Sequence, residues 1–346
     1  MRVLALRSHK SPITCIVPLS DDYVLTSDQS GVVIKWSLPI KRPVLTWTAH
    51  TDSILTLLKW HRYIITHSRD STIKIWLEDK LQYEFPVNAL NFSNLVLFQD
   101  RYLVTPATTD SNNIDIYRLN DEPISITREV ANFSSYNLVH KLKLDDIQGR
   151  NDFGIVMKML IIGQVLYIGY ESGDIIGLTI TLPQPSITQS STTTSIINKD
   201  VKLCLQYHNS SHAPNPIISL AALDNTLVSG STGKKVIIHT DPVKICKLNE
   251  SGIQAIVPYD DNLIVGFWNG VIESPTRSIQ TIQRSLPHID AEDMKTTVKL
   301  TCMCMLSKSE SKAAVERYSK LIKQKKYGDL LLVGYEDGTI VGYTFS

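Results

Sequence analysis

The sequence predicts an all-β fold in which seven similar four-stranded sheets are arranged radially in a ring. Three observations support this prediction: strand-like runs occupy most of the chain, similar units recur along it, and the last unit is one strand short. With 346 residues, 43% of them hydrophobic, the chain is long enough for one large β architecture or two ordinary domains. The recurrence of one unit favours a single domain over residues 1–346.

The N-terminal segment "RVLALR", residues 2–7, precedes the first unit and belongs to none of the seven. At the other end of the chain, the last unit finishes on its third strand, "TIVGYTF", and would leave an unpaired sheet edge. We therefore expect "RVLALR" to pair with "TIVGYTF", to supply the missing outer strand and to close the ring.

The units are defined by turn residues that precede short runs rich in Val, Ile, Leu, Thr and Tyr. The segments "GYESGDIIGL" at 169–178 and "GYEDGTIVGY" at 334–343 share Gly, Tyr, Glu, Gly, Ile and Gly at matching places, and a weaker copy lies at 228–239. The remaining turn-to-strand segments run from Gly31 to Trp36, Ser71 to Trp76, Asn112 to Tyr117 and Gly270 to Pro275. Because proline cannot donate to a β-ladder, the last of these predicts an irregular third strand in the sixth unit.

Seven units of about 42 residues would occupy ~294 positions, and two further segments account for most of the remainder. The tract at 182–200 is rich in Ser and Thr and poor in apolar residues, which predicts a flexible loop. The segment at 307–328 predicts a helix inserted between the first and second strands of the last unit, because Ser307 and Glu310 fit a capping box. Its basic face either contacts solvent or docks a partner, and it contains Lys320, Lys323, Lys325 and Lys326.

Charge and cysteine content narrow the class of protein. The formal net charge is only +1, which argues against a nucleic-acid or anionic-membrane surface and favours protein partners. The five cysteines are scattered, no secretory signal is recognisable, and no run reaches the ~18 apolar residues of a membrane helix, so we expect a soluble intracellular protein.

No cofactor or metal site is predicted. Cys302 and Cys304 lack a second pair of ligands at zinc-site spacing, and His208 and His212 lie in a segment read as a polar loop. The glycines of "GYESG" and "GYEDG" precede no helix, so they are expected to form tight turns rather than a phosphate site.

The segments from His9 to Trp36 and from His50 to Trp76 resemble repeats of the WD-repeat β-propeller family. The resemblance implies a seven-bladed β-propeller. It also implies that a His before each blade, a Ser or Thr on its second strand, an Asp in the next turn and a Trp on its third strand share hydrogen bonds. His50, Ser68, Asp70 and Trp76 match these roles. We expect only this set to be complete, because Ser30 rather than an Asp stands six positions before Trp36.

The same residues could be read as a catalytic triad of Ser68, His50 and Asp70. No glycine pattern typical of a nucleophile elbow surrounds Ser68, so a structural role is favoured and no catalytic residue is predicted. Trp60 and Trp268 lie in predicted turns on opposite faces of the ring. They are candidate partner-binding residues, because exposed aromatic side chains often anchor interfaces.

Over most of its length the chain is also similar to the fungal ASTRA-associated WD-repeat family, whose animal relative is the G-protein-β-like protein 1. This resemblance implies a non-catalytic adaptor, nuclear and cytoplasmic, that acts with the Triple-T cochaperone in the maturation of phosphatidylinositol-3-kinase-related kinases. The implied partners are large helical-repeat cochaperone subunits and these kinases, bound by a monomeric propeller within assemblies linked to chromatin remodelling. The alternative is a substrate receptor of a cullin ubiquitin ligase, although Ser37 and Leu77 replace the Asp of the Trp-Asp-x-Arg signature.

Overall fold

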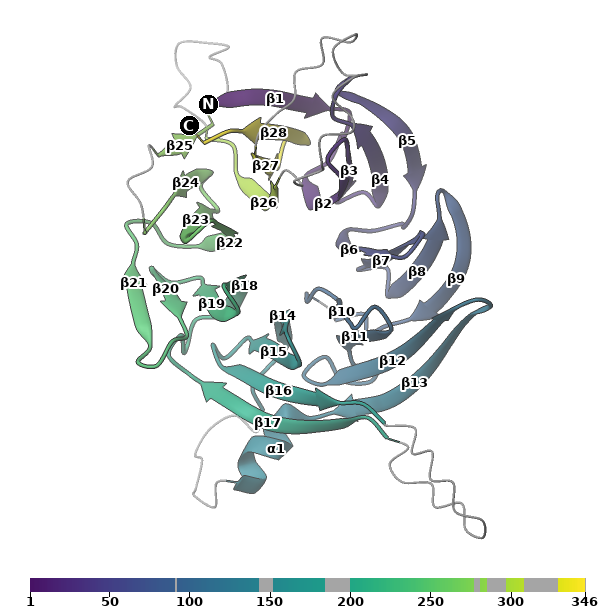
Figure 1. Ribbon diagram of the computed structural model, residues 1–346, viewed down its shortest axis with the longest axis vertical. Helices are drawn as coiled ribbons and strands as arrows, with labels where there is room; N and C mark the ends of the chain where they lie inside the picture. The colour runs from purple at the N-terminus through teal and green to yellow at the C-terminus, as the bar shows by residue number, and fades with distance from the viewer. Residues whose placement is uncertain are drawn as a thin grey trace, which may run out of the picture.

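The computed structural model describes residues 1–90, 92–142, 152–183, 200–276, 281–284, 297–307 and 329–345. Within these residues, seven four-stranded antiparallel sheets surround a common axis like the blades of a propeller (Figure 1). The predicted seven-bladed β-propeller is therefore confirmed. In each blade the first strand lies nearest the axis and the fourth strand lies at the periphery (Figure 1).

The blades follow one another in chain order. Blade 1 contains β2 (Ile13–Ser20), β3 (Tyr23–Asp28), β4 (Val32–Ser37) and β5 (Arg42–Thr48); blade 2 contains β6 (Ile54–Trp60), β7 (Tyr63–Ser68), β8 (Thr72–Leu77) and β9 (Lys80–Pro86). Blade 3 contains β10 (Val96–Phe98), β11 (Tyr102–Pro106), β12 (Ile114–Asp121) and β13 (Ile124–Phe133); blade 4 contains β14 (Val156–Ile162), β15 (Val165–Tyr170), β16 (Ile175–Thr181) and β17 (Lys202–Asn209). Blade 5 contains β18 (Ile217–Leu223), β19 (Thr226–Ser231), β20 (Lys235–Ile238) and β21 (Lys244–Lys247); blade 6 contains β22 (Ile253–Tyr259), β23 (Asn262–Phe267), β24 (Val271–Glu273) and β25 (Ile282–Gln283).

Blade 7 joins the two ends of the chain. It contains β26 (Leu300–Leu306), β27 (Leu330–Tyr335), β28 (Thr339–Tyr343) and, as its outer strand, β1 (Arg2–Arg7). The strands β1 and β28 are antiparallel, with Leu4 opposite Gly342 and Leu6 opposite Ile340. A side chain at Gly342 would meet Leu4 Cβ at 2.9 Å, so glycine allows the two strands to pair closely. The predicted closure of the ring by "RVLALR" is confirmed.

Neighbouring blades pack face to face through apolar side chains. Trp36 of blade 1 lies in a buried cluster with Leu4 and Leu330 of blade 7, and Trp76 of blade 2 lies in a cluster with Leu25 of blade 1. Because both faces of each sheet are covered, the central strands read as continuous apolar runs rather than alternating ones; every residue of β27 is buried.

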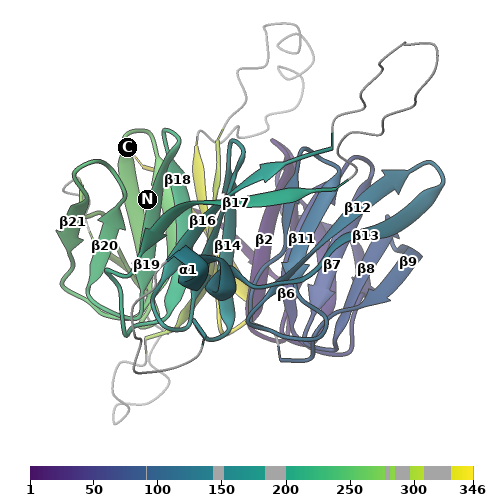
Figure 2. The ribbon, with the colours of Figure 1, turned by 90° about the horizontal axis from the view of Figure 1, so that it is seen from below.

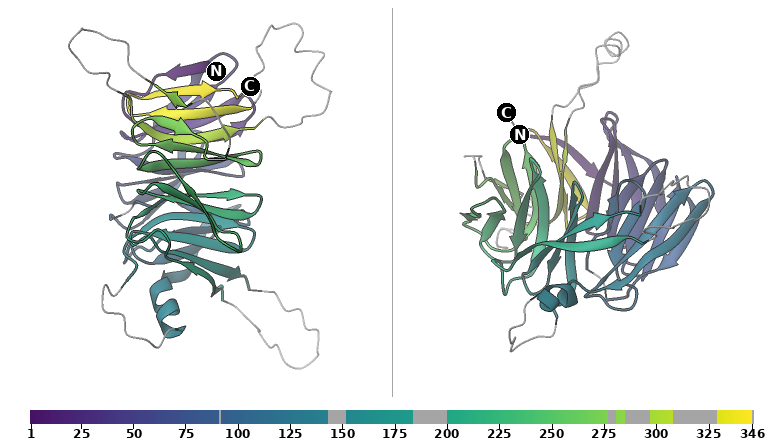
Figure 3. Two further views of the ribbon diagram at one scale, coloured as in Figure 1. Left: turned by 90° about the vertical axis from the view of Figure 1, so that its left-hand side faces the viewer. Right: turned by 60° about the horizontal axis from the view of Figure 1, so that its bottom comes forward.

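The strands run approximately along the ring axis, so their connections lie on two faces (Figures 2 and 3). One face, here called the histidine face, carries the connections between blades and the turns between second and third strands; His9, His50 and His212 lie in such connections. The opposite face carries the other turns of each blade, among them His61 and Glu78. The two faces offer separate surfaces to partners.

One α-helix occurs in the described residues, and its position was not predicted. Helix α1 (Ser135–Leu142) lies between blades 3 and 4, at the periphery outside β17 (Figures 1 and 3). Ser134 Oγ accepts the Asn137 N–H at 3.2 Å, as an N-cap does, and Val139 packs into a cluster with Phe153. The predicted helix at 307–328 lies outside the described residues apart from Ser307, as does the predicted loop at 182–200 apart from its ends.

The sixth blade is irregular, as Pro275 predicted. Its third strand, β24, has three residues and ends before the proline, and only two residue pairs join it to β23. None of the helical segments in the described ranges combines the length and the apolar character needed to cross a lipid bilayer.

Candidate functional site

Blade 2 contains a buried hydrogen-bond network centred on His50. This residue lies in the connection between β5 of blade 1 and β6 of blade 2. His50 Nδ1 lies 2.8 Å from Asp70 Oδ2, and His50 Nε2 lies 2.6 Å from Thr66 Oγ1. Trp76 Nε1 donates to the same Thr66 oxygen at 2.8 Å. With the carboxylate accepting from Nδ1–H, the Thr66 hydroxyl donates to Nε2 and accepts from the indole. The network thus satisfies every polar group that it buries.

The hydroxyl of this network comes from Thr66, so the prediction of Ser68 is wrong. Ser68 Oγ donates to the Asp52 carbonyl at 3.0 Å and accepts the Asp70 N–H at 3.2 Å. Residues 66 and 68 point to the same side of β7, so their spacing from Asp70 cannot distinguish them. The register decides: Trp76 pairs with Ile64 and its indole nitrogen lies beside Thr66.

Blade 1 carries a complete network as well, contrary to the expectation that only blade 2 would. His9 Nδ1 lies 2.7 Å from Asp28 Oδ2, and its Nε2 lies 2.8 Å from Thr26 Oγ1. Trp36 Nε1 donates to Thr26 Oγ1 at 2.8 Å. The acid is Asp28, which sits where Ser68 sits in blade 2, while Ser30 occupies the place of Asp70. Ser30 Oγ donates to Asp28 Oδ1 at 2.7 Å.

The two acids are held ionised by their hydrogen bonds. Burial raises the pKa of Asp28 and Asp70, but hydrogen bonds from the paired histidine and a neighbouring hydroxyl outweigh it, so both pKa values lie below the usual range. Burial lowers the pKa of His50, and the attraction of Asp70 offsets this only in part. At neutral pH the pair is a neutral imidazole beside a carboxylate, a stable arrangement in the interior.

Blade 5 contains a related network that lacks the acid. His212 Nε2 lies 2.8 Å from Ser229 Oγ, and Ser229 Oγ lies 2.6 Å from His239 Nε2. His239 stands where blade 2 has Trp76, and its Nδ1 lies 2.6 Å from the Tyr207 hydroxyl. Gly233 stands where blade 2 has Asp70, and His212 Nδ1 is buried without a hydrogen-bond partner in the described residues. Burial lowers the pKa of His212 to about 3 and that of His239 to about 4.

The segment containing His208 and His212 is not a simple polar loop. His208 lies on β17 and its Nε2 is 2.8 Å from Asp174 Oδ1, whereas His212 belongs to the blade 5 network. The two histidines therefore have different partners. Within the part of the chain that the structure describes, no three His, Cys, Asp or Glu side chains are grouped closely enough to hold a metal ion.

The paired cysteines lie on β26, the innermost strand of blade 7, and neither forms a disulfide. Burial raises the pKa of the Cys302 thiol well above its usual value and that of Cys304 to about 12. Because the thiolate is the reactive form, both are poor nucleophiles at neutral pH. Their position favours packing over chemistry.

The candidate partner-binding residues differ in exposure. Trp268 follows β23 on the histidine face, is 44% exposed and lies against Gly252. Trp60 is only 1% exposed, and its Nε1 donates to the Asp100 carbonyl of blade 3 at 2.9 Å. The expectation of an exposed Trp60 is wrong, because this residue ends β6 and fills the seam between blades 2 and 3. Lys320, Lys323, Lys325 and Lys326 lie outside the described residues.

Comparison with known proteins gives a consistent result. A family model described as ASTRA-associated protein 1 matches residues 2–343. The ASTRA-associated protein 1 of Lodderomyces elongisporus is 47% identical, with 98% of this chain and 96% of the relative covered. The corresponding proteins of Candida tropicalis and Candida albicans are each 45% identical, with 98% of both chains covered. Among solved structures, the computationally designed Ika8 protein matches with a TM-score of 0.57 over 99% of each chain at 13% identity, a likeness of fold alone.

Proposed function

The chain belongs to the ASTRA-associated protein 1 family, and from this premise we propose that it is a non-catalytic protein-interaction scaffold of ASTRA-type assemblies. The observation that carries the proposal is the extent of the family match, which runs from residue 2 to residue 343 and so includes the strands of all seven blades and the closing strand. The chain shares the whole ring with its relatives rather than one motif.

The construction of the ring supports a scaffold. The histidine networks of blades 1 and 2 bury their polar groups, and those groups bind one another. What a partner meets are the turns on the two faces, held in place by sheets that are covered on both sides. Rigid frameworks that display loops are suited to binding, because little ordering entropy is lost when a partner docks.

The finer proposal follows the family resemblance. The scaffold acts with the Triple-T cochaperone in the maturation of phosphatidylinositol-3-kinase-related kinases, in the nucleus and the cytoplasm. One copy of the ring contacts large helical-repeat subunits and the kinases. Trp268 is the proposed contact on the histidine face, and the lysines of 307–328 (Lys320, Lys323, Lys325 and Lys326) are proposed contacts outside the described residues.

Affinity purification of the tagged full-length chain tests the function. Mass spectrometry of the recovered proteins is expected to show Triple-T components and kinases of this class, enriched over a mock purification. Recovery of cullin ligase subunits without them would replace the proposal with the substrate-receptor alternative. Fluorescence microscopy of the tagged chain tests the proposed distribution between nucleus and cytoplasm.

Trp268→Ala tests the proposed contact on the histidine face. Because the side chain is 44% exposed, its loss is expected to change the free energy of unfolding by less than about 1 kcal/mol. An interface anchor of this kind commonly contributes 2 kcal/mol or more to binding, so partner recovery should fall by about tenfold or more. Ile245→Ala is the matched control, because Ile245 is 53% exposed on β21. Equal recovery with both variants would remove Trp268 from the interface.

A further inference from the structure

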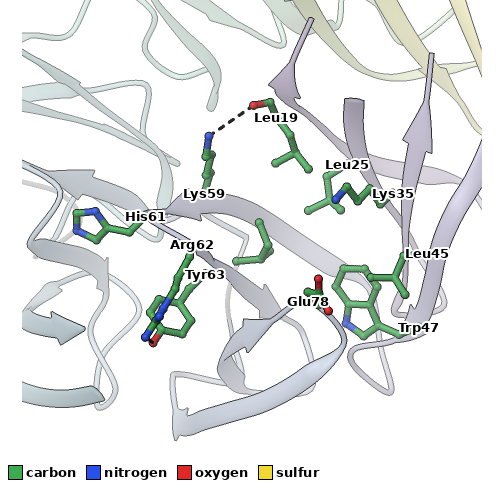
Figure 4. A pocket seen from close by; sticks show the side chains of 11 residues that line it. Leu19, Leu25, Lys35, Leu45, Trp47, Lys59, His61, Arg62, Tyr63 and Glu78 are labelled. Carbon is green, nitrogen blue, oxygen red and sulfur yellow. Dashed lines mark hydrogen bonds between the residues drawn. The ribbon is translucent and has the colours of Figure 1, made fainter. Parts of the chain in front are cut away.

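The opposite face contains a pocket of about 250 Å³ at the seam between blades 1 and 2 (Figure 4). Its apolar wall contains Leu25, Leu45 and Trp47 from blade 1 and Ile64 and Tyr63 from blade 2. Trp47 also contacts Trp76 of blade 2, with ring centroids 6.2 Å apart. The pocket therefore has a firm apolar surface made by two adjacent blades.

One residue accounts for the opening of this seam. Lys35 directly precedes Trp36 in blade 1, and at the same place in blade 2 Ile75 directly precedes Trp76. Ile75 is fully buried in the cluster that fills the seam between blades 2 and 3. Lys35 pairs with Leu25 and Leu45 in the sheet, but its ammonium extends outward to the Tyr23 ring, 5.1 Å from the ring centroid. A cation at this place leaves the seam partly unfilled.

Basic groups surround the pocket. Lys35, Lys59, His61 and Arg62 line it, and Glu78 is the one acidic residue among the described lining residues. Lys35 and Lys59 form no ion pair with the described residues, and Lys59 Nζ reaches only the Leu19 carbonyl, at 3.5 Å. Arg62 contacts Glu122 at 3.1 Å, but both side chains are more than half exposed, so the pair is weak. On a protein of net charge +1, this is a local excess of positive charge.

The size of the pocket limits what it can hold. A closed apolar cavity of about 150 Å³ accommodates a benzene molecule, whereas whole small-molecule ligands occupy about 300–1,000 Å³. A volume near 250 Å³ suits one large apolar side chain. Tyr23 and Leu81, which are 39% and 46% exposed, extend the apolar surface beside the pocket. Tyr23 pairs with Ser37, two positions after Lys35, and Leu81 pairs with Trp76, so both lie on the pocket side of their sheets. A bound peptide would therefore contact the protein through more residues than the one that fills the pocket.

We propose that this pocket binds a short extended segment of a partner protein that presents one aromatic or large aliphatic side chain flanked by Asp or Glu. The apolar side chain fills the space beside Leu45 and Trp47, and the flanking carboxylates pair with Lys35 and Lys59. This inference rests on the proposed scaffold function and specifies the chemistry of one of its partners. The chain's own segment 308–328 has the wrong charge, with seven Lys or Arg and two Glu.

An arrayed library of short peptides tests the proposal on the full chain. The central residue is varied, and the flanking residues are acidic, neutral or basic. Binding is expected to favour Phe, Trp, Leu or Met at the centre with acidic flanks, and to weaken as salt is raised. Equal binding of basic peptides, or no dependence on the central residue, would overturn the proposal.

Charge reversal identifies the pocket as the site. Lys35→Glu combined with Lys59→Glu is expected to weaken binding of the best peptide by at least about tenfold. Lys244→Glu, a charge reversal in blade 5 and so away from the pocket, should leave binding unchanged. Leu45→Ala, which keeps the charges, should also weaken binding. Melting temperatures of the variants show whether each is folded. Unchanged peptide binding in folded variants would exclude this pocket.

Failure of this inference and failure of the scaffold function give different results. If the charge-reversed chain recovers its partners in affinity purification as well as the wild-type chain does, the scaffold function stands and the pocket does not serve it. If the wild-type chain recovers no ASTRA-type partners, the function fails, while the peptide measurements still report whether the pocket binds acidic segments.

Discussion

Blades 2 and 5 contain the same buried network with and without its acid. In blade 2, His50 contacts Asp70 and Thr66, and Trp76 completes the set. In blade 5, Ser229 takes the place of Thr66 and His239 that of Trp76, yet His212 Nδ1 faces no carboxylate of the described residues. The geometry of the histidine, the hydroxyl and the ring N–H therefore persists when the residue types change. The acid is a separable part, and its absence leaves one buried polar atom unpaired.

A tyrosine of the neighbouring blade 4, Tyr207 on β17, shows how such a replacement is compensated. If the Tyr207 hydroxyl donates to His239 Nδ1, then His239 Nε2 carries a proton and donates to Ser229, as the Trp76 indole donates to Thr66. Ser229 then donates to His212 Nε2. Among the residues that the structure describes, this order leaves one N–H of the network, at His212 Nδ1, without an acceptor. A buried donor of this kind costs on the order of 1–3 kcal/mol.

The largest effect is expected where one hydroxyl serves two partners. Thr66→Val preserves side-chain shape but leaves His50 Nε2 and the Trp76 indole N–H unpaired, so the free energy of unfolding should fall by roughly 3 kcal/mol. Ser68→Ala, which removes a hydroxyl two residues away, should cost about 1 kcal/mol. Urea denaturation of both variants measures the difference. A larger loss for Ser68→Ala would contradict the assignment of Thr66 to the network.

Acidification should weaken blade 5 through His212. The pKa of this ring is about 3 in the folded chain against 6.5 for an ordinary histidine, so between these values the unfolded chain binds a proton that the folded chain does not. Stability present above pH 6.5 is therefore lost as the pH falls toward 3, by about 2 kcal/mol on reaching pH 5. His212→Gln keeps an acceptor for Ser229 and removes the titration. Its loss of stability between pH 7 and pH 5 should be smaller than that of wild type by this amount, and an equal loss would show that His212 titrates normally.

The smallest effect is a gain, obtained by adding the missing acid. The backbone at Gly233 is not in the left-handed region, and a Cβ there would lie 3.4 Å from Ser231 Oγ, an ordinary contact. Gly233→Asp should place a carboxylate near His212 Nδ1 and raise the free energy of unfolding by about 1 kcal/mol over Gly233→Ala. The alanine variant controls for the backbone effect of removing a glycine. Equal stability of the two would mean that the carboxylate does not reach the ring.

The ring could be predicted from the sequence because its determinants are repeated and local. Matching turns such as those ending in Gly173 and Gly338 mark the units, and an unpaired last strand requires a partner that only Arg2–Arg7 could supply. Each of these signals depends on residues close together in the chain or on the count of strands. Neither needs knowledge of how one sheet aligns with the next.

The contents of the networks depend on register, which the sequence does not state. Thr66 and Ser68 lie on one side of a strand, and only the pairing of Trp76 with Ile64 selects between them. In blade 1 the acid and the serine exchange places, so a search at the spacing of blade 2 finds Ser30 and overlooks Asp28. A search for either arrangement would have found both networks.

Burial between blades was equally inaccessible from the sequence. Trp60 stands beside a turn, where aromatic residues are commonly exposed, but its indole is covered by blade 3 and donates to Asp100. Helix α1 has an N-cap serine as a sequence signal, yet it is only eight residues long, which is too short for an apolar repeat to stand out. The helix predicted at 307–328 had a fuller capping signal, because Ser307 and Glu310 fit a capping box.

The pairing of β1 with β28 has a consequence for how the chain is made. Translation produces Leu4 and Leu6, which end up 2% and 1% exposed, long before Ile340 and Gly342 exist to receive them. At about 5–20 residues per second, this delay lasts roughly 20 to 70 seconds. During that time six blades can assemble in order on the ribosome, while β1 remains unpaired and its apolar side chains remain exposed to solvent. A chain that stopped before Thr339 would lack β28, which pairs with both β1 and β27, so two strands would keep unpaired edges of the kind that promote aggregation.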